Sequence, residues 1–342
     1  MLKTRTGLFL WLLGILLAAA DVLVAAEVNV YSARKEALIK PLLDRFTKQT
    51  GIEVDLVTGK ADALLSRLVS EGSNSPADLF ITVDAGRLYR AKEAGVLQPI
   101  SVPELETIVP AAYRDPEGYW YGLSLRARVI AYARERVDPA DLSTYEDLAD
   151  PKWKGKICIR SSDNIYNQSL VASLIAGNGE AATEQWAVGL VANMARRPVG
   201  GDRDQIKAVA AGQCDLAAVN TYYYGMMLNA EAGSPDHEAA RKTALFWPNQ
   251  QGRGAHVNVS GAGVTAHARH RENAVRLLLF LLGPDAQQWY SEANYEYPVR
   301  EGVPISPTVA AWGPFKADTL NLERIGVDNR AAVMLMDRAG WK

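Results

Sequence analysis

The feature that most constrains the fold is an alternation of short apolar segments with longer amphipathic ones at the start of the chain. Three apolar segments have the length and composition of buried strands, at residues 28–31, 51–56 and 77–82. Two segments between them have the apolar spacing of helices, at residues 37–49 and 61–71. The order of strand, helix, strand, helix and strand predicts an α/β fold built on parallel strands.

Parallel strands joined by right-handed crossovers leave a crevice outside their carboxyl ends, and ligands bind there. We therefore expect a ligand where the loops after the three strands meet, at residues 31–35, 58–60 and 83–86. A second α/β segment begins after Tyr121. Its expected strands lie at residues 129–132 and around the two cysteines, with a helix near residues 167–176.

The length of 342 residues exceeds what one hydrophobic core usually serves, so we expect two lobes. Strand-like segments at residues 257–260 and 263–266 resemble those of the opening lobe, which predicts that the chain returns there before it ends on the second lobe. Such crossings make a hinge beside a cleft between the lobes. The expected boundaries are 27–125 plus about 253–303 for the N-terminal lobe, and 126–252 plus about 304–342 for the C-terminal lobe.

The first residues have the features of a secretory signal. Lys3 and Arg5 precede an uncharged apolar run, and small residues precede Glu27. Because the run is shorter than the ~20 residues of a spanning helix, we expect residues 1–26 to be a cleaved signal peptide, with a retained N-terminal anchor as the alternative. No Cys follows closely enough for lipid attachment, so in a double-membrane bacterium we expect a periplasmic protein.

Composition says little about the partner. The formal charge of −2 gives no reason to expect nucleic acid or an anionic membrane surface as a partner, and the 48% hydrophobic content is ordinary for a globular protein. We expect a monomer without a nucleic-acid partner.

The two cysteines, Cys158 and Cys214, each lie in a short apolar run typical of a buried strand. In an oxidising compartment this predicts a disulfide between them, and two separate buried thiols are the alternative. If the bond forms, the two strands are neighbours, and the loops after them open at the same edge of the sheet. Tyr166, in the loop after the first strand, then approaches Tyr222 and Tyr223 after the second.

Tyr222, Tyr223 and Tyr224 directly follow the predicted strand that contains Cys214. Adjacent side chains of a strand point to opposite faces, so two neighbouring tyrosines serve one site only where the strand ends and a helix starts. Gly225 is expected to permit that change of direction. The alternative is an aromatic cluster packed in the core with its hydroxyls hydrogen-bonded.

Converging phenols would favour ferric iron. A phenol with a pKa of ~10 loses its proton near neutral pH only to a strongly polarising cation, and three phenolates balance a trivalent ion. Thiolates and thioethers favour softer metals instead. Remaining coordination positions can take a small anion, which would call for nearby arginines such as Arg34, Arg126 or Arg128, although each of these can equally form an ordinary ion pair.

Eight motifs spread over nearly the whole chain after residue 26 resemble those of the bacterial ferric-ion-binding proteins of iron ABC importers. They are residues 30–34, 75–79, 125–130, 151–156, 166–170, 200–205, 220–225 and 295–299. The resemblance implies a two-lobed type II periplasmic binding protein fold with a hinged cleft. It also implies Fe(III) as cargo, a permease in the inner membrane as partner, and Tyr166, Tyr222 and Tyr223 as the iron ligands.

Some members of that family add a His where this chain has Arg34 or Lys35, and an acidic ligand where it has Val83. Without these, the chain resembles the branch that uses tyrosines alone with a carbonate or bicarbonate anion, held by arginines matching Arg34 and Arg126. We expect four residues to support this site from its surroundings: Tyr31, Asp84, Arg128 and Tyr224. The four histidines are expected on the surface or in loops.

Two other functions compete with iron binding. The same fold can bind an organic anion, a polyamine or a thiamine-like solute, but such a ligand needs stacking surfaces rather than three converging phenol oxygens. A secreted hydrolase is not supported, because the sequence contains neither a G-x-S-x-G elbow nor an H-E-x-x-H helix. The sequence therefore predicts a binding protein and not an enzyme.

Overall fold

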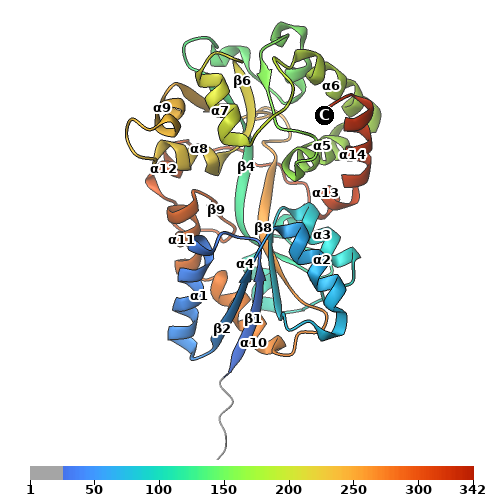
Figure 1. Ribbon diagram of the computed structural model, residues 1–342, viewed down its shortest axis with the longest axis vertical. Coiled ribbons are helices and arrows are strands. Elements are labelled where there is room, and N and C mark those ends of the chain that lie inside the picture. The colour runs from blue at the N-terminus through green and yellow to red at the C-terminus, as the bar shows by residue number, and fades with distance from the viewer. Residues whose placement is uncertain (1–25) are drawn as a thin grey trace, which may run out of the picture.

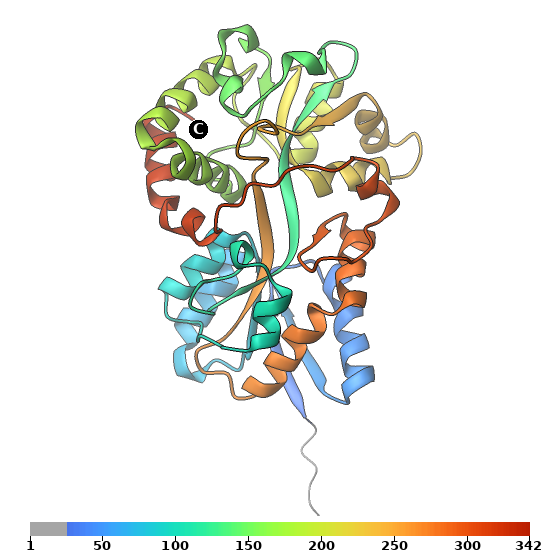
Figure 2. The ribbon, with the colours of Figure 1, turned by 180° about the vertical axis from the view of Figure 1, so that it is seen from behind.

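A computed structural model describes residues 26–342, so the predicted signal peptide lies almost entirely outside the described residues. Figures 1 and 2 show two lobes stacked along the long axis. The strands are β1 Glu27–Ser32, β2 Glu53–Thr58, β3 Leu79–Val83, β4 Tyr121–Ala133, β5 Ile157–Cys158, β6 Leu216–Asn220, β7 Thr243–Phe246, β8 Val257–Val264 and β9 Tyr297–Pro298. Within the described residues, no helix has the length and apolar character needed to cross a membrane.

Helices cover the sheet in both lobes. Those before residue 120 are α1 Glu36–Thr50, α2 Ala61–Glu71, α3 Ala85–Glu93 and α4 Pro103–Ile108. The middle of the chain forms α5 Ile165–Asn178, α6 Glu180–Asn193, α7 Asp202–Ala210, α8 Thr221–Leu228 and α9 Pro235–Arg241. The last part forms α10 Arg271–Leu281, α11 Pro284–Asn294, α12 Pro307–Ala310, α13 Glu323–Val327 and α14 Asn329–Arg338.

The opening of the chain folds as the alternation predicts. β1 pairs in parallel with both β2 and β3, and α1 and α2 connect them. The helix α1 buries Ile39, Leu42, Leu43 and Phe46 on one face, and it ends at Gly51, whose φ of 73° suits the left-handed cap. The two-lobed α/β prediction is confirmed.

Two long strands run through both lobes. The strand order is β2-β1-β3-β8-β4-β6-β5, with β7 and β9 also paired to β4. The first part of β4 pairs with β8 and β9, and its second part pairs with β6 and β7. Figure 1 accordingly shows β4 and β8 passing from one lobe to the other. The residue boundaries of the lobes stay predictions.

The two strands predicted at residues 257–260 and 263–266 are one strand, β8. The strand continues through residues 261 and 262, which separate the two predicted segments. A Cβ on Gly261 would lie 2.7 Å from the carbonyl oxygen of Tyr121, and one on Gly263 would lie 2.5 Å from that of Tyr119. These glycines allow neighbouring backbone to pass close to the strand and do not end it.

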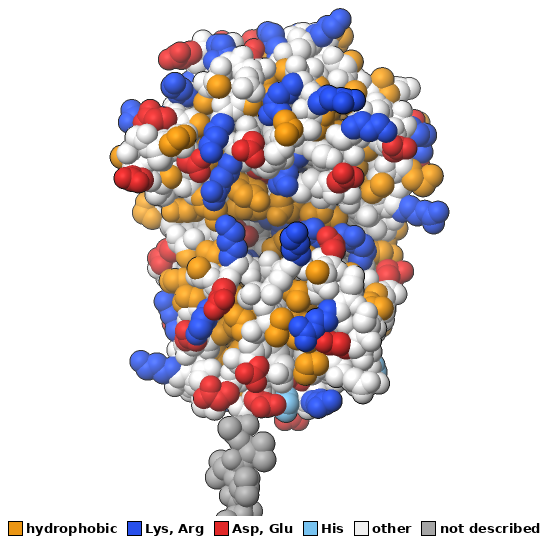
Figure 3. Space-filling view, in the orientation of Figure 1, with side chains coloured by type: hydrophobic (Ala, Val, Ile, Leu, Met, Phe, Trp, Pro, Cys, Tyr) orange, Lys and Arg blue, Asp and Glu red, His pale blue; other side chains and the backbone are white. Residues whose placement is uncertain are grey.

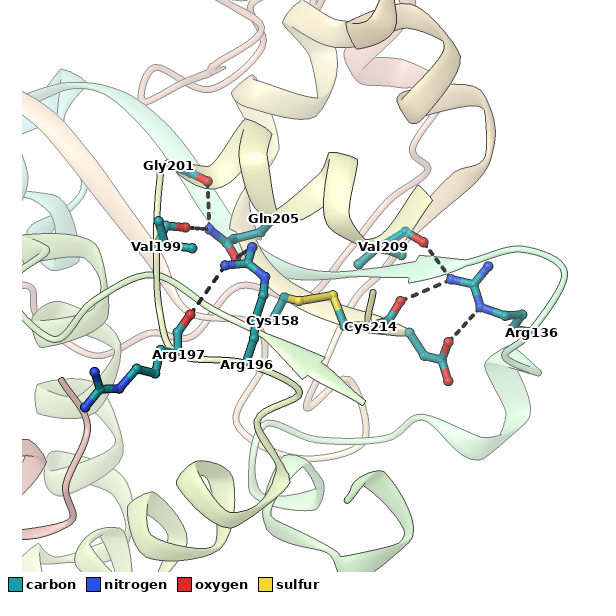
Figure 4. The surroundings of a disulfide bond; sticks show 10 residues. Arg136, Cys158, Arg196, Arg197, Val199, Gly201, Gln205, Val209 and Cys214 are labelled. Carbon is teal, nitrogen blue, oxygen red and sulfur yellow. Dashed lines mark hydrogen bonds and ion pairs between the residues drawn. A yellow bond between two sulfur atoms is a disulfide. The ribbon is translucent and has the colours of Figure 1, made fainter. Parts of the chain in front are cut away.

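The predicted disulfide between Cys158 and Cys214 is confirmed (Figure 4). It joins β5 to the residues just before β6, and the two strands pair in parallel. Arg136 joins the two ends of the connection between α7 and β6. It donates hydrogen bonds to the carbonyl oxygens of Val209 and Cys214, at 2.6 and 3.1 Å. As a result, the segments that follow both strands start from the same edge of the sheet.

We expect that replacing Cys158 and Cys214 by Ala lowers the free energy of unfolding by about 2–4 kcal/mol, because the bond closes a loop of 56 residues. Urea unfolding of the oxidised protein and of the variant measures the difference. An unchanged midpoint and slope would contradict a stabilising role for the bond.

Candidate metal-binding site

A cavity of about 230 Å³ lies in the groove between the two lobes. Figure 3 shows this groove with side chains of the hydrophobic class, which includes Tyr, along its wall and with Lys and Arg on both rims. The charged and phenolic residues that line the cavity are Arg34, Lys35, Arg126, Tyr166, Arg203, Tyr222, Tyr223 and Glu296.

Tyr222 and Tyr223 lie in the first turn of α8, which starts at Thr221 directly after the last residue of β6. Their ring centroids are 4.3 Å apart. The change of direction occurs before the tyrosines, so the prediction that Gly225 provides it was wrong. Gly225 lies inside α8, and a Cβ there would lie 2.6 Å from Cβ of Tyr295, so its small size permits close packing.

Tyr166 reaches the same cavity from the start of α5. The side chain of Asn164 caps this helix by accepting a hydrogen bond from the backbone N–H of Tyr166. The hydroxyl of Tyr222 donates to the hydroxyl of Tyr166 at 3.1 Å. The structure therefore brings Tyr166, Tyr222 and Tyr223 to one wall of the cavity.

The phenols of Tyr166 and Tyr222 have raised pKa values and resist ionisation in the iron-free protein. Burial raises the pKa of Tyr166 to about 12; the Tyr223 phenol adds to the shift and the Arg126 guanidinium opposes it. Burial, with the nearby Tyr166 and Tyr223, raises the pKa of Tyr222 well above its ordinary value. The negative charge of one phenolate makes ionisation of the neighbouring phenol less favourable. A cation between them is therefore needed for all of them to be ionised at once.

Arg34 lies on the opposite side of the cavity, between β1 and α1, and its terminal nitrogens are both engaged. Nη2 donates to Glu296 at 2.6 Å, and Nη1 donates to Ser124 at 3.2 Å. Burial alone would raise the pKa of Glu296, but Arg34 holds it below its ordinary range. The pair is thus a charged one, and Nε is the Arg34 nitrogen that has no hydrogen-bond partner among the described residues.

Arg126 projects from β4 and has a free terminal nitrogen. Nη2 donates to Asp84 at 3.1 Å, and Nη1 is buried without a hydrogen-bond partner among residues 26–342. Its guanidinium carbon lies 5.6 Å from the ring centroid of Tyr166. An unpaired buried donor beside the phenols is suited to an anion.

The other supporting residues named from the sequence lie outside the cavity wall. Arg128 is buried and donates to Asn167 and Asn220, at 2.6 and 3.0 Å. Tyr31 donates to Glu71, and Tyr224 turns into the core and donates to the carbonyl oxygen of Thr243. Asp84 is buried behind the wall and contacts Arg126.

The sequence analysis did not identify Glu296 as a residue of the cavity, and it did not predict that His256 is buried. Glu296 is the one carboxylate among the described residues that line the cavity, and it also accepts from Ser124 at 2.9 Å. It lies inside a motif singled out above, but nothing local marks it as a partner of Arg34. His256, predicted at the surface or in a loop, lies in the connection before β8 but is only 3% exposed, and burial together with Arg253 and Arg128 lowers its pKa well below the ordinary value.

The donor chemistry of the site is therefore phenolic. In the described part of the chain, no cluster of three or more His, Cys, Asp or Glu side chains is arranged to hold a metal ion. Three phenol oxygens with an unpaired arginine nitrogen beside them can hold a hard, highly charged cation and an accompanying anion.

Comparison with known proteins gives consistent results. The family model described as "Bacterial extracellular solute-binding protein" matches residues 74–318. The chain is 51% identical to iron uptake protein A1 of Synechocystis sp. over 92% of this chain and 88% of that protein. It is 32% identical to the Fe(3+)-binding periplasmic protein of Serratia marcescens, over 91% of this chain and 89% of that protein.

Among solved structures, the chain resembles the IdiA (FutA) protein of Trichodesmium in complex with iron and citrate ligands. The TM-score is 0.90 at 52% sequence identity, over 93% of this chain and 100% of that one. The match extends across both lobes.

Proposed function

Because the chain belongs to the family of bacterial extracellular solute-binding proteins, we propose that it binds Fe(III) between its lobes as the solute-binding component of an iron ABC importer. The ligands are the phenolates of Tyr166, Tyr222 and Tyr223. The observation that carries this proposal is the meeting of the Tyr222 and Tyr166 hydroxyls at 3.1 Å, with the Tyr223 ring alongside.

Fe(III) fits the charge and the hardness of this donor set. Three phenolates neutralise a trivalent cation, and that cation removes the mutual repulsion that keeps the phenols protonated. Softer metals prefer thiolate, thioether and imidazole ligands, and among the described lining residues the one such donor is the sulfur of Met226, which accepts from Arg203 at 3.2 Å.

The names of the relatives support the proposed cellular context. They are named as iron uptake and Fe(3+)-binding periplasmic proteins. We place this protein in the periplasm after removal of its signal peptide, as a monomer that delivers iron to a permease of the inner membrane. The iron-loaded form is the one that the permease recognises, and no catalytic step is involved.

A small anion completes the site. Carbonate or bicarbonate would accept hydrogen bonds from Nη1 of Arg126 and from Nε of Arg34, which are buried and have no hydrogen-bond partner among the described residues. The Trichodesmium structure contains citrate with its iron. Citrate is therefore the alternative anion, and the experiment below compares the two.

Replacing Arg126 by Gln is expected to raise the bicarbonate concentration for half-maximal iron loading by about tenfold or more, because a hydrogen bond to a charged group is lost. The readout is the phenolate-to-iron absorbance band at fixed ferric iron. Arg203→Gln removes the same charge from the same cavity and is the control. Equal bicarbonate requirements in both variants would contradict the role of Arg126, and a requirement met by citrate alone would assign the anion to citrate.

A further inference from the structure

Asp84 has a backbone conformation that L residues rarely adopt. It lies between β3 and α3 with φ 86° and ψ 127°, where a side chain is strained. Its backbone N–H donates to the carbonyl oxygen of Val259, and the next N–H, of Ala85, donates to the side chain of Asn258. Contacts with β8 therefore hold this residue in an unfavourable conformation, although glycine would fit the backbone without strain.

The contacts of the Asp84 carboxylate show what this side chain does that a glycine at position 84 could not do. It is fully buried, and both of its oxygens are used. Oδ1 accepts from the backbone N–H of Gly86 at 3.0 Å and from the hydroxyl of Ser169 at 2.5 Å. Oδ2 accepts from Nη2 of Arg126 at 3.1 Å.

These partners belong to different lobes. Asp84 precedes α3 in the lobe built on β1 to β3, whereas Ser169 lies on α5 in the other lobe (Figure 1). The approach is close, because a Cβ on Gly86 would lie 3.4 Å from Cδ1 of Ile165. The hydrogen bond from Ser169 therefore joins the lobes at the carboxylate that also holds Arg126.

We propose that Asp84 is a positioning residue that couples anion binding at Arg126 to the contact between the lobes. This inference rests on the proposed anion-assisted iron site. By holding Nη2, the carboxylate fixes the guanidinium of Arg126, whose Nη1 has no hydrogen-bond partner among the described residues. The same carboxylate accepts a hydrogen bond from the hydroxyl of Ser169. This bond fixes the Asp84 side chain to the lobe that carries the three phenols.

Coupling of this kind is reciprocal. If the bond from Ser169 orients the carboxylate that orients Arg126, then the contact between the lobes raises anion affinity, and a bound anion strengthens that contact by the same factor. Loss of Ser169 must then weaken anion binding, although Ser169 is not among the residues that line the cavity.

The test compares bicarbonate titrations of the ferric phenolate band in the wild-type protein and in Ser169→Ala, Ser173→Ala and Asp84→Asn variants. Ser173 is the matched control: it is a buried serine on the same helix, and its hydroxyl donates to the carbonyl oxygen of Leu170. Asn has the size and shape of Asp, so it meets the same backbone strain and keeps an acceptor for Gly86, but it removes the charge beside Arg126.

Ser169→Ala is expected to raise the half-maximal bicarbonate concentration about fivefold to tenfold, and Asp84→Asn at least as much, while Ser173→Ala stays at the wild-type value. An unchanged band maximum checks that Tyr166 still binds iron. A Ser169→Ala protein that melts lower but titrates like Ser173→Ala would show a merely structural bond and overturn the coupling. A wild-type protein without the band would instead refute the iron site itself.

Discussion

Replacing Tyr222 and Tyr223 together by Phe is expected to remove most of the visible phenolate-to-iron band, since only the Tyr166 phenolate is left, and to lower ferric affinity by roughly a thousandfold or more. Loss of a group that merely supports a metal ligand already costs about 10- to 100-fold in affinity, and here two ligands are removed. The change deletes two oxygens and keeps both rings, so the packing of the rings at 4.3 Å remains. Competition against a ferric chelator measures the affinity.

Tyr224→Phe is the matched control, since it makes the same chemical change at the next position of α8. Its hydroxyl donates to the carbonyl oxygens of Ala240 and Thr243 and does not face the cavity. We expect this variant to be somewhat less stable but to bind iron with the wild-type colour. Retention of the full band in the double variant, or its loss in Tyr224→Phe, would place the iron elsewhere.

Iron binding is expected to weaken steeply in acid. The pKa of Tyr166 is raised to about 12 and that of Tyr222 lies well above its ordinary value, so both phenols are protonated in the iron-free protein at neutral pH. Each phenol that binds as a phenolate releases a proton. The iron-free state therefore holds more protons, and lowering the pH favours it.

The expected slope is about a tenfold loss of affinity per pH unit for each proton released, hence about a thousandfold per unit for three phenolates at constant carbonate. A pH indicator in weakly buffered solution counts the protons released when ferric iron is added. Tyr166→Phe should release about one proton fewer. A count that is the same in wild type and variant would show that Tyr166 binds as a neutral phenol or not at all.

Local pattern was enough to predict the scaffold. The strands β1 to β3 follow from short apolar runs, and the helices between them follow from apolar residues at helical spacing. The disulfide followed from two cysteines in apolar runs, and it placed Tyr166 and Tyr222 at one sheet edge. These inferences depend on neighbours in sequence or on one covalent bond.

The electrostatic partners in the cavity could not be derived in the same way. Glu296 meets Arg34 across 262 positions of the chain, and Ser169 meets Asp84 across 85. The burial of His256 likewise depends on long-range pairing, because its carbonyl oxygen accepts from Arg128 of β4. No local periodicity encodes such contacts, since they arise only when the two lobes and the crossing strands are assembled.

The most direct measurement of the central claim is the visible difference spectrum of the purified wild-type protein as ferric citrate is added in the presence of bicarbonate. Phenolate ligation by Tyr166, Tyr222 and Tyr223 predicts a charge-transfer band that grows in proportion to iron and saturates at one iron per chain. A protein that stays colourless through this titration would contradict tyrosine-held ferric iron.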